Sequence, residues 1–204
     1  MTVKIGCVVE GKSEVAAVPI LIRRVAAIHY PELETVIPRP IRIPRNKVFR
    51  IGELERAVSL AYQNIGRQGA VFIILDSDDD CPAELGPALL HRVSQVFRNV
   101  PIAVVLAKHE FEAWFLAAAE SLRGQRGLRN DLNPPDNPEG IRGAKEWLSH
   151  QMESSRTYTE TQDQPALAAL FDTEQARQTD SFDKCYRDIV RLLGELRDRT
   201  GMPP

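Results

Sequence analysis

Residues 71–80, VFIILDSDDD, join a run of apolar side chains to a cluster of aspartates. The apolar part is short, rich in β-branched residues and free of polar alternation, which is typical of a parallel strand buried on both faces. Residues 3–9 and 102–107 have the same character. The sequence therefore predicts a parallel sheet built around these three strands.

Helical patterns lie between and after the strands. Residues 13–28 are dense in apolar side chains, and apolar residues recur every three or four positions in segments that end at Ile65 and Phe97. The second of these segments is expected to begin after Gly86-Pro87, where proline suits the first helical turn. Strands that alternate with helices of this length indicate βαβ units on a parallel sheet. A last helix is predicted by an apolar stripe of the same spacing, formed by Phe182, Tyr186, Ile189, Leu193 and Leu196.

These patterns predict an α/β fold. We expect a mainly parallel, Rossmann-like sheet of about four strands, flanked by helices and followed by a C-terminal helical appendage. The fourth strand is expected near residues 35–43, and the α/β core is expected to span residues 1–122. Residues 123–204 are expected to hold a loop insertion rich in Gly, Pro, Asn and Arg, and C-terminal helices that pack on the core.

The composition of the 204-residue chain is that of a single globular domain, with or without an appendage. Hydrophobic residues make up 43% of the chain, which is enough for a core. The 26 Lys and Arg residues nearly balance the 28 Asp and Glu residues, and the formal net charge of -2 excludes a basic field over the whole surface. Any polyanion must then be bound locally.

Nothing in the sequence indicates a membrane or a secretory route. The longest apolar stretches are far shorter than the ~20 residues that span a bilayer, and the N-terminus lacks the pattern of a signal peptide. Cys7, Cys81 and Cys185 are odd in number and far apart, which argues against a disulfide framework and a zinc site. We therefore expect a cytoplasmic protein.

The aspartates after the second strand are candidate metal ligands. If the chain stays extended past Leu75, then Asp76, Asp78 and Asp80 point to one side. Carboxylates gathered in this way repel one another unless a cation compensates them, and such oxygen ligands suit Mg²⁺ or Mn²⁺. Glu10 ends the first strand, and the carboxyl ends of neighbouring parallel strands meet at one edge. We expect Glu10 and Asp76 to converge there; a solvated acidic turn is the alternative interpretation.

Residues 6–13, GCVVEGKS, also match the phosphate-binding P-loop pattern G-x-x-x-x-G-K-[ST]. In a P-loop the first glycine ends the strand, whereas the apolar run after Gly6 is better suited to continuing it. A nucleotide-binding protein, with Asp76 as a Walker-B-like metal ligand, therefore stays an alternative function. Lys12 and Ser13 can contact a phosphate at the start of the helix under either interpretation.

Two further groups of charged residues are candidates for the site. Glu110 and Glu112 follow the third apolar strand, where they can form a second metal site or be exposed acids of a first helical turn. Lys145 can neutralise a transition state or be a solvated charge. Residues 39–50 carry five cations and no acid, and two prolines favour an extended chain. We expect a phosphate-tracking edge there, formed by Arg39, Arg42, Arg45 and Lys47, with protection of a sheet edge as the alternative.

Residues 9–14, VEGKSE, followed by a strand that ends in D-x-D, resemble the Toprim domain of topoisomerases, bacterial primases and OLD-family nucleases. The resemblance implies divalent-metal-dependent cleavage or joining of phosphodiester bonds. It implies that Glu10, Asp76 and Asp78 are the catalytic carboxylates. The metal ligands would then be Glu10, Asp76, Asp78 and Asp80, with Glu14, Glu110, Glu112 and Lys145 as a second site or as support.

Three further motifs resemble one bacterial branch of Toprim-like proteins, the domain-of-unknown-function 4276 family. They are HEFEAW at 109–114, NPE at 137–139 with Lys145, and Ser181-Phe182. We therefore expect a magnesium-dependent nuclease or related phosphodiester-cleaving protein acting on DNA or RNA, in a bacterial defence or DNA-processing module. A non-catalytic metal- or nucleic-acid-binding subunit beside a partner ATPase is the alternative that fold analogy suggests.

Overall fold

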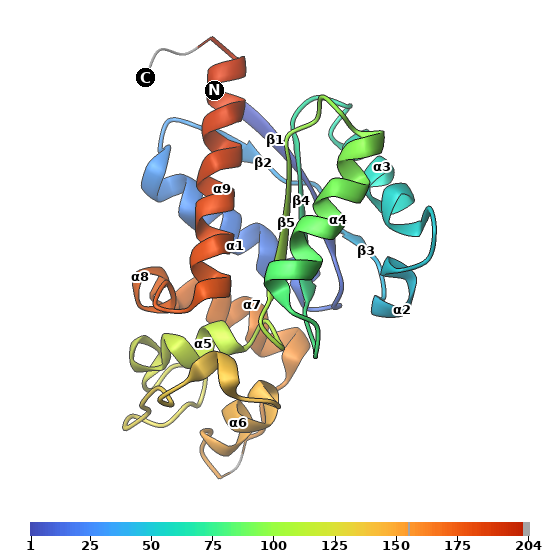
Figure 1. Cartoon of the computed structure of the whole chain (residues 1–204). Helices are drawn as coiled ribbons and strands as arrows, with labels where there is room; N and C mark the ends of the chain where they lie inside the picture. Colours follow the sequence, from blue (N-terminus) through green and yellow to red (C-terminus); the bar gives the residue numbers. More distant parts are fainter. Residues whose placement is uncertain (155, 202–204) are drawn as a thin grey trace.

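The computed structural model describes residues 1–154 and 156–201 and has an α/β architecture (Figure 1). Its sheet is parallel, with the strand order β2-β1-β4-β5, and β3 also pairs with β1. The predicted α/β fold is confirmed. The strands are β1 (Thr2–Val9), β2 (Glu34–Val36), β3 (Ile41–Arg42), β4 (Ala70–Asp76) and β5 (Ile102–Ala107).

The strand predicted near residues 35–43 is two short strands. β2 pairs with the first half of β1 through Thr2 and Glu34, whereas β3 pairs with its last residues through Val8 and Ile41. Pro38 and Pro40 lie between them and have no N–H to donate to a ladder. The two prolines therefore interrupt what would otherwise be one edge strand.

Helices cover both faces of the sheet (Figure 1). α1 (Glu14–His29) and α9 (Asp180–Arg199) share one hydrophobic cluster with one face, and α3 (Glu53–Asn64) and α4 (Pro82–Val96) share another with the opposite face. This explains the lack of polar alternation in the strands, because Val71, Ile73 and Leu75 face α3 and α4 while Phe72 and Ile74 face α1 and α9. α9 thus completes one helical layer of the sheet.

Shorter elements gather beyond the carboxyl ends of the strands (Figure 1). Rings of α5 pack against rings that follow α7 and lie in α9: the ring centroids of Trp114 and Phe182 are 5.1 Å apart, and those of Phe115 and Phe171 are 5.4 Å apart. This aromatic packing fixes the chain after β5 against α9. These elements are α5 (Ala113–Ala117), η1 (Ala119–Leu122), η2 (Pro138–Gly140), α6 (Ala144–His150), α7 (Glu160–Leu170) and α8 (Thr173–Ala176).

Two boundaries differ from the sequence-based expectation. α4 begins at Pro82 rather than after Pro87, because Pro82 already meets the preference of proline for the first helical turn. Residues expected to be extended form the short helix α2 (Arg45–Val48). Pro44 has extended backbone angles and precedes this helix, so proline sets its start instead of preventing it.

Gly6 lies inside β1 and does not open a P-loop. The next residues, Cys7 to Val9, pair with Phe72 to Ile74 of β4, so the strand continues as the apolar run predicts. A side chain at Gly6 would place its Cβ 2.5 Å from the carbonyl oxygen of Ala61 in α3. The glycine therefore permits a close approach of helix and strand, and the P-loop interpretation is not supported.

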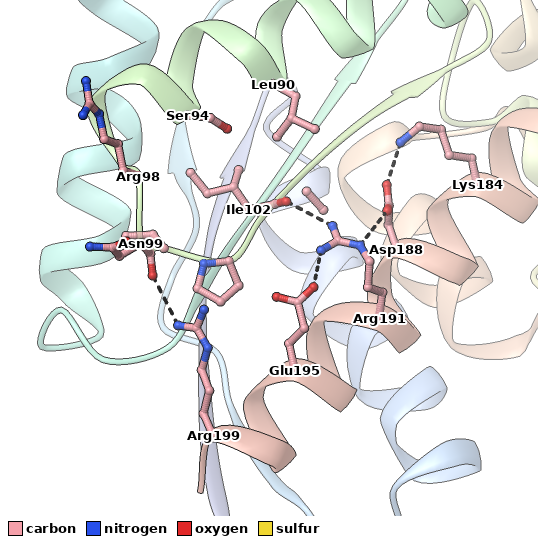
Figure 2. Close-up of a pocket in the computed structure, with 13 residues that line it drawn as sticks. Leu90, Ser94, Arg98, Asn99, Ile102, Lys184, Asp188, Arg191, Glu195 and Arg199 are labelled. Carbon is pink, nitrogen blue, oxygen red and sulfur yellow. Dashed lines mark hydrogen bonds and ion pairs between the residues drawn. The ribbon is translucent and has the colours of Figure 1, made fainter.

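One side of β5 pairs with no strand in the described residues (Figure 2). Two cations of α9 bind its outward carbonyl groups instead: Arg191 donates to the oxygen of Ile102 at 3.0 Å, and Lys184 donates to that of Val104 at 2.9 Å. Asp188 pairs with both cations.

No helix of the described residues has the length and apolarity needed to cross a bilayer.

Candidate functional site

The site lies where β1, β4 and β5 end side by side. Glu10 follows β1, Asp76 is the last residue of β4, and the loop 108–112 follows β5. Neighbouring strands are ~4.8 Å apart, so residues at these ends lie close together. The backbone N–H of Phe111 donates to Oδ1 of Asp76 at 2.9 Å, which fixes the partly buried carboxylate against the next strand end.

Glu14 supports Glu10 from the first turn of α1. Its buried carboxylate accepts hydrogen bonds from the backbone N–H groups of Glu10 at 2.9 Å and Gly11 at 3.0 Å. These two hydrogen bonds close the turn between strand and helix. Oε2 of Glu10 is buried and has no hydrogen-bond partner within the described chain. Glu14 therefore holds the turn, and Glu10 keeps an oxygen that needs a donor or a cation.

Glu112 and Lys145 form the other side of the site. The fully buried Glu112 accepts hydrogen bonds at Oε1 from the Tyr158 hydroxyl at 2.9 Å and from Gln164 at 3.0 Å. Its Oε2 lies 3.9 Å from Nζ of Lys145, which lies 3.7 Å from Oε2 of Glu160. A single ammonium group therefore lies between two carboxylates. The interpretation of Glu112 as an exposed helix-turn acid is wrong.

Burial and like charge favour the protonated form of these acids. Desolvation raises the pKa of Glu10 and of Glu112 to about 7. Desolvation, and then the neighbouring charges of Glu14 and Glu112, raise the pKa of Asp76 well above its ordinary value. Burial opposes the charge of Lys145, but the surrounding carboxylates, led by Glu112 and Asp76, raise its pKa. The site thus holds more acid than its one central lysine balances.

The chain does not stay extended after Asp76. The N–H of Asp80 donates to the carbonyl of Ser77 at 2.9 Å, and Asp78 has a positive φ of 48°, so these residues form a turn. The side chains of Asp78 and Asp80 are 59% and 53% exposed. The expected row of three aspartates on one face is therefore absent from the described structure, and Asp76 alone enters the buried site.

Arg45 binds this turn. Its guanidinium donates to the carbonyl oxygens of Asp76 at 2.8 Å and Ser77 at 3.2 Å, lies 3.4 Å from the carboxylate of Asp78, and pairs with Asp80. Asp79 pairs instead with Arg142. A cation expected on a phosphate-binding edge thus holds the acidic turn, because α2 carries it to the end of β4.

The loop after β5 closes onto the same turn. The N–H of His109 donates to the hydroxyl oxygen of Ser77 at 2.9 Å, and Nδ1 of His109 lies 2.6 Å from the carbonyl oxygen of Asp78. Next to it, Oε2 of Glu110 is buried and lacks a hydrogen-bond partner in the described residues. His109 therefore joins two loops, and Glu110 adds another unsatisfied oxygen to the site.

The donor set suits a divalent cation. Glu10, Glu110 and Glu112 each have a buried Oε2 without a hydrogen-bond partner among the described residues, and carboxylate oxygens are the ligands that Mg²⁺ and Mn²⁺ take. In this conformation, no three His, Cys, Asp or Glu side chains of residues 1–154 and 156–201 are placed to share an ion. The residues fit a metal by chemistry, and sharing one requires their side chains to move together.

The expected phosphate-binding residues separate into different places. Lys12, Arg39 and Arg42 line one hollow at the side of the sheet. Ser13 is buried, and its hydroxyl donates to Glu160 at 2.6 Å. Lys47 is exposed on α2. The row of cations in residues 39–50 is therefore not one continuous edge.

The sequence motifs beyond β5 meet in a hydrogen-bond network. The indole N–H of Trp114 donates to Oγ of Ser181 at 2.8 Å, and the N–H of Ser181 donates to Glu139 at 3.0 Å.

Tyr158, Glu160 and Gln164 were not expected in the site. They follow no strand, and they reach it from the region of α7, so no local pattern indicates them.

The comparisons with known proteins identify one family. A family model described as "Domain of unknown function (DUF4276)" matches residues 9–189, which include every carboxylate of the site. No curated protein and no solved structure matches the chain.

Proposed function

Because the chain belongs to the DUF4276 family, whose description names no activity, we propose a function from the site itself: a Toprim-like, Mg²⁺- or Mn²⁺-dependent nuclease or related phosphodiester-cleaving protein. One observation carries the proposal. Glu10, Asp76 and Glu112 follow or end three neighbouring strands and carry unsatisfied or strongly perturbed carboxyl groups, and the charges of Asp76 and Glu112 act on Lys145. Such clusters of perturbed groups mark catalytic sites.

Glu10 and Asp76 would hold the metal ion. Glu10 follows β1 and Asp76 ends the adjacent β4, Asp76 is oriented by the N–H of Phe111, and Oε2 of Glu10 has no hydrogen-bond partner among the described residues. Asp78 now lies 3.4 Å from Arg45, and its side chain is exposed. It would join the other two ligands by turning away from Arg45. A divalent ion held by these carboxylates would supply Lewis-acid polarisation of a phosphodiester and favour the deprotonation of water. Asp80 and Glu110 border the site and are secondary candidates.

Lys145 would oppose negative charge on the substrate. The carboxylates around it keep its ammonium group protonated, and Glu112 fixes its position from 3.9 Å. A preorganised cation of this kind stabilises charge that develops on a leaving oxygen. Where other carboxylates hold the ion, Glu10 would instead accept a proton from water, because its Oε2 has no hydrogen-bond partner in the described residues.

The test is cleavage of DNA and RNA in Mg²⁺ or Mn²⁺. The purified protein is incubated with plasmid and with labelled oligonucleotides, and products are measured on gels. Asp76→Asn and Glu10→Gln are expected to lower the rate at least ~100-fold, because both remove a ligand charge while preserving shape. Asp198→Asn is the matched control, since Asp198 is exposed at the C-terminal end of α9 and pairs with Arg197.

Circular dichroism must first show that the variants are folded. Cleavage that persists in EDTA, or that Asp76→Asn leaves at the wild-type rate, would rule out the metal-dependent site. A folded protein that cleaves neither DNA nor RNA in either metal would favour a non-catalytic role.

A further inference from the structure

A hollow of about 600 Å³ lies beside the first turn of α1. Its charged lining consists of Lys12, Arg39 and Arg42, and Asn64 from the end of α3 adds a neutral amide. The three cations are exposed. Apolar side chains complete the wall, among them Pro40 and Ile41. The hollow therefore combines positive charge with an apolar surface.

No acidic residue lines this hollow in the described structure. None of its three cations forms an ion pair with another of the described residues. Arg45 and Arg92, by contrast, each bind a carboxylate. Cations gathered without a counter-charge repel one another, and an anion from solution offsets that repulsion. Nε of Arg42 donates to the carbonyl of Glu10 at 3.0 Å, which anchors its guanidinium and leaves the terminal nitrogens for such an anion.

The hollow adjoins the carboxylate site through Glu10. Arg42 binds the Glu10 carbonyl, and Lys12 is two residues further along the chain. Two residues span at most ~7 Å, which is comparable with the distance between neighbouring phosphates along one nucleic-acid strand. A strand with one phosphodiester at Glu10 and Asp76 can thus place a neighbouring phosphate at Lys12, Arg39 and Arg42.

We propose that this hollow binds a backbone phosphate of the nucleic-acid strand whose neighbouring phosphodiester lies at the carboxylate site. The choice of ligand rests on the proposed function. A polymer suits the hollow better than a small anion, because the cavity is much larger than a phosphate ion and its apolar wall can contact a sugar or base. The hollow also compensates locally for the repulsion between a polyanion and the acidic site.

The test measures binding without cleavage. A fluorescein-labelled single-stranded oligonucleotide is titrated in EDTA and followed by anisotropy at several salt concentrations. The triple variant Lys12→Gln/Arg39→Gln/Arg42→Gln is expected to bind ~10-fold or more weakly. The negative slope of log association constant against log salt concentration should become smaller in magnitude by about 2, because each of the three lost phosphate contacts to a single strand contributes about 0.7.

A matched triple variant controls for net charge. Arg50→Gln/Arg56→Gln/Arg98→Gln removes the same charge from exposed cations outside the hollow and is expected to bind within about twofold of wild type. Equal losses in the two triple variants, or wild-type affinity in the first, would overturn the proposal. Competition distinguishes the source of phosphate: displacement of the oligonucleotide by equimolar mononucleotide or inorganic phosphate would overturn a polymer-binding role.

The two proposals fail separately. Asp76→Asn is expected to retain oligonucleotide binding while it loses cleavage, because Asp76 does not line the hollow. Binding that depends on the hollow in a protein that cleaves nothing would contradict only the nuclease function. Cleavage by a protein whose binding ignores the hollow would contradict only this inference.

Discussion

Glu112 is held by residues that lie far from it in the sequence. Tyr158 and Gln164 donate to the same oxygen of its carboxylate, and Lys145 lies near the other oxygen. Two neutral donors and one shared cation compensate only part of the cost of burying a charge. This residue therefore couples the protonation state of the site to folding.

Replacement of Glu112 by Gln tests that coupling. Because burial raises its folded-state pKa to about 7, above the unfolded value, its favourable contribution to stability is complete below the unfolded pKa and is lost as pH rises through about 7. The free energy of unfolding should fall between pH 5 and pH 8, by on the order of 3 kcal/mol from this group. Glu112→Gln keeps an oxygen that accepts the hydrogen bond of Tyr158 and removes the carboxyl group that titrates.

The measurement is urea denaturation at several pH values. A smaller slope of stability against pH is expected in Glu112→Gln, with Glu10 accounting for part of the remainder. Glu84→Gln, an exposed acid of α4, should leave the slope of the wild type. An unchanged slope in Glu112→Gln would contradict the assigned pKa.

At the residue scale, the sequence predicted the acids at strand ends and little of their setting. Glu10 and Asp76 follow directly from the rule that parallel strands end at one edge. The positions of Asp78 and Asp80 were predicted wrongly. Side chains alternate between two faces only while the chain is extended, and the chain turns at Ser77. The partners of Glu112 come from other elements, which no local pattern reports.

At the scale of elements, the contact between β1 and α3 depends on Gly6. A Cβ at this position would lie 2.5 Å from the carbonyl oxygen and 2.8 Å from the carbonyl carbon of Ala61. Both contacts are to backbone, so no side-chain rotation relieves them. Helix and strand must separate to admit even one methyl group.

Gly6→Ala is therefore expected to destabilise the fold by about 1–3 kcal/mol, the usual cost of overpacking a core. Thermal and urea denaturation measure the loss. Gly86→Ala is the control: its Cβ would have no neighbour nearer than the Val104 carbonyl at 4.0 Å, and alanine favours helix α4 by up to ~1 kcal/mol. Equal stability of Gly6→Ala and wild type would show that α3 can shift without cost.

The strength of each pattern decided which elements could be predicted. β1, β4 and β5 were predicted nearly to their ends, because burial on both faces requires unbroken apolar runs. The sequence did not predict α2, since its four residues follow a proline and carry no apolar periodicity. The single strand expected near residues 35–43 was wrong in detail because prolines interrupt it.

At the scale of the whole molecule, the site joins distant parts of the chain. Glu10 and Asp76 belong to the sheet, whereas Lys145 and Glu160 come from the elements beyond β5. One hydrophobic cluster extends from Val3 in β1 to α9. Any ion that binds these carboxylates together therefore stabilises contacts between both parts of the chain.

Divalent metal should accordingly raise the melting temperature, and more at pH 8 than at pH 5.5. Carboxylates bind metal when ionised, and burial raises the pKa values of Glu10, Asp76 and Glu112. At 100 times the dissociation constant the gain is about 2.7 kcal/mol, or roughly 5 °C or more for a chain of this size.

Calorimetric melting in Mg²⁺ or Mn²⁺, with NaCl at matched ionic strength, measures this effect. Asp76→Asn is expected to abolish the metal-induced shift while Asp198→Asn retains it. A shift of the same size in Asp76→Asn, or one that grows as pH falls, would place the metal elsewhere.

The cations along β5 also limit what copies of the protein can do to one another. An incoming strand would have to displace Arg191 from Ile102 and Lys184 from Val104 before its own N–H groups could reach those carbonyls. Asp188 keeps both cations in place. The sheet is thereby prevented from continuing into a neighbouring molecule along this edge, which favours solubility at high concentration over open-ended assembly.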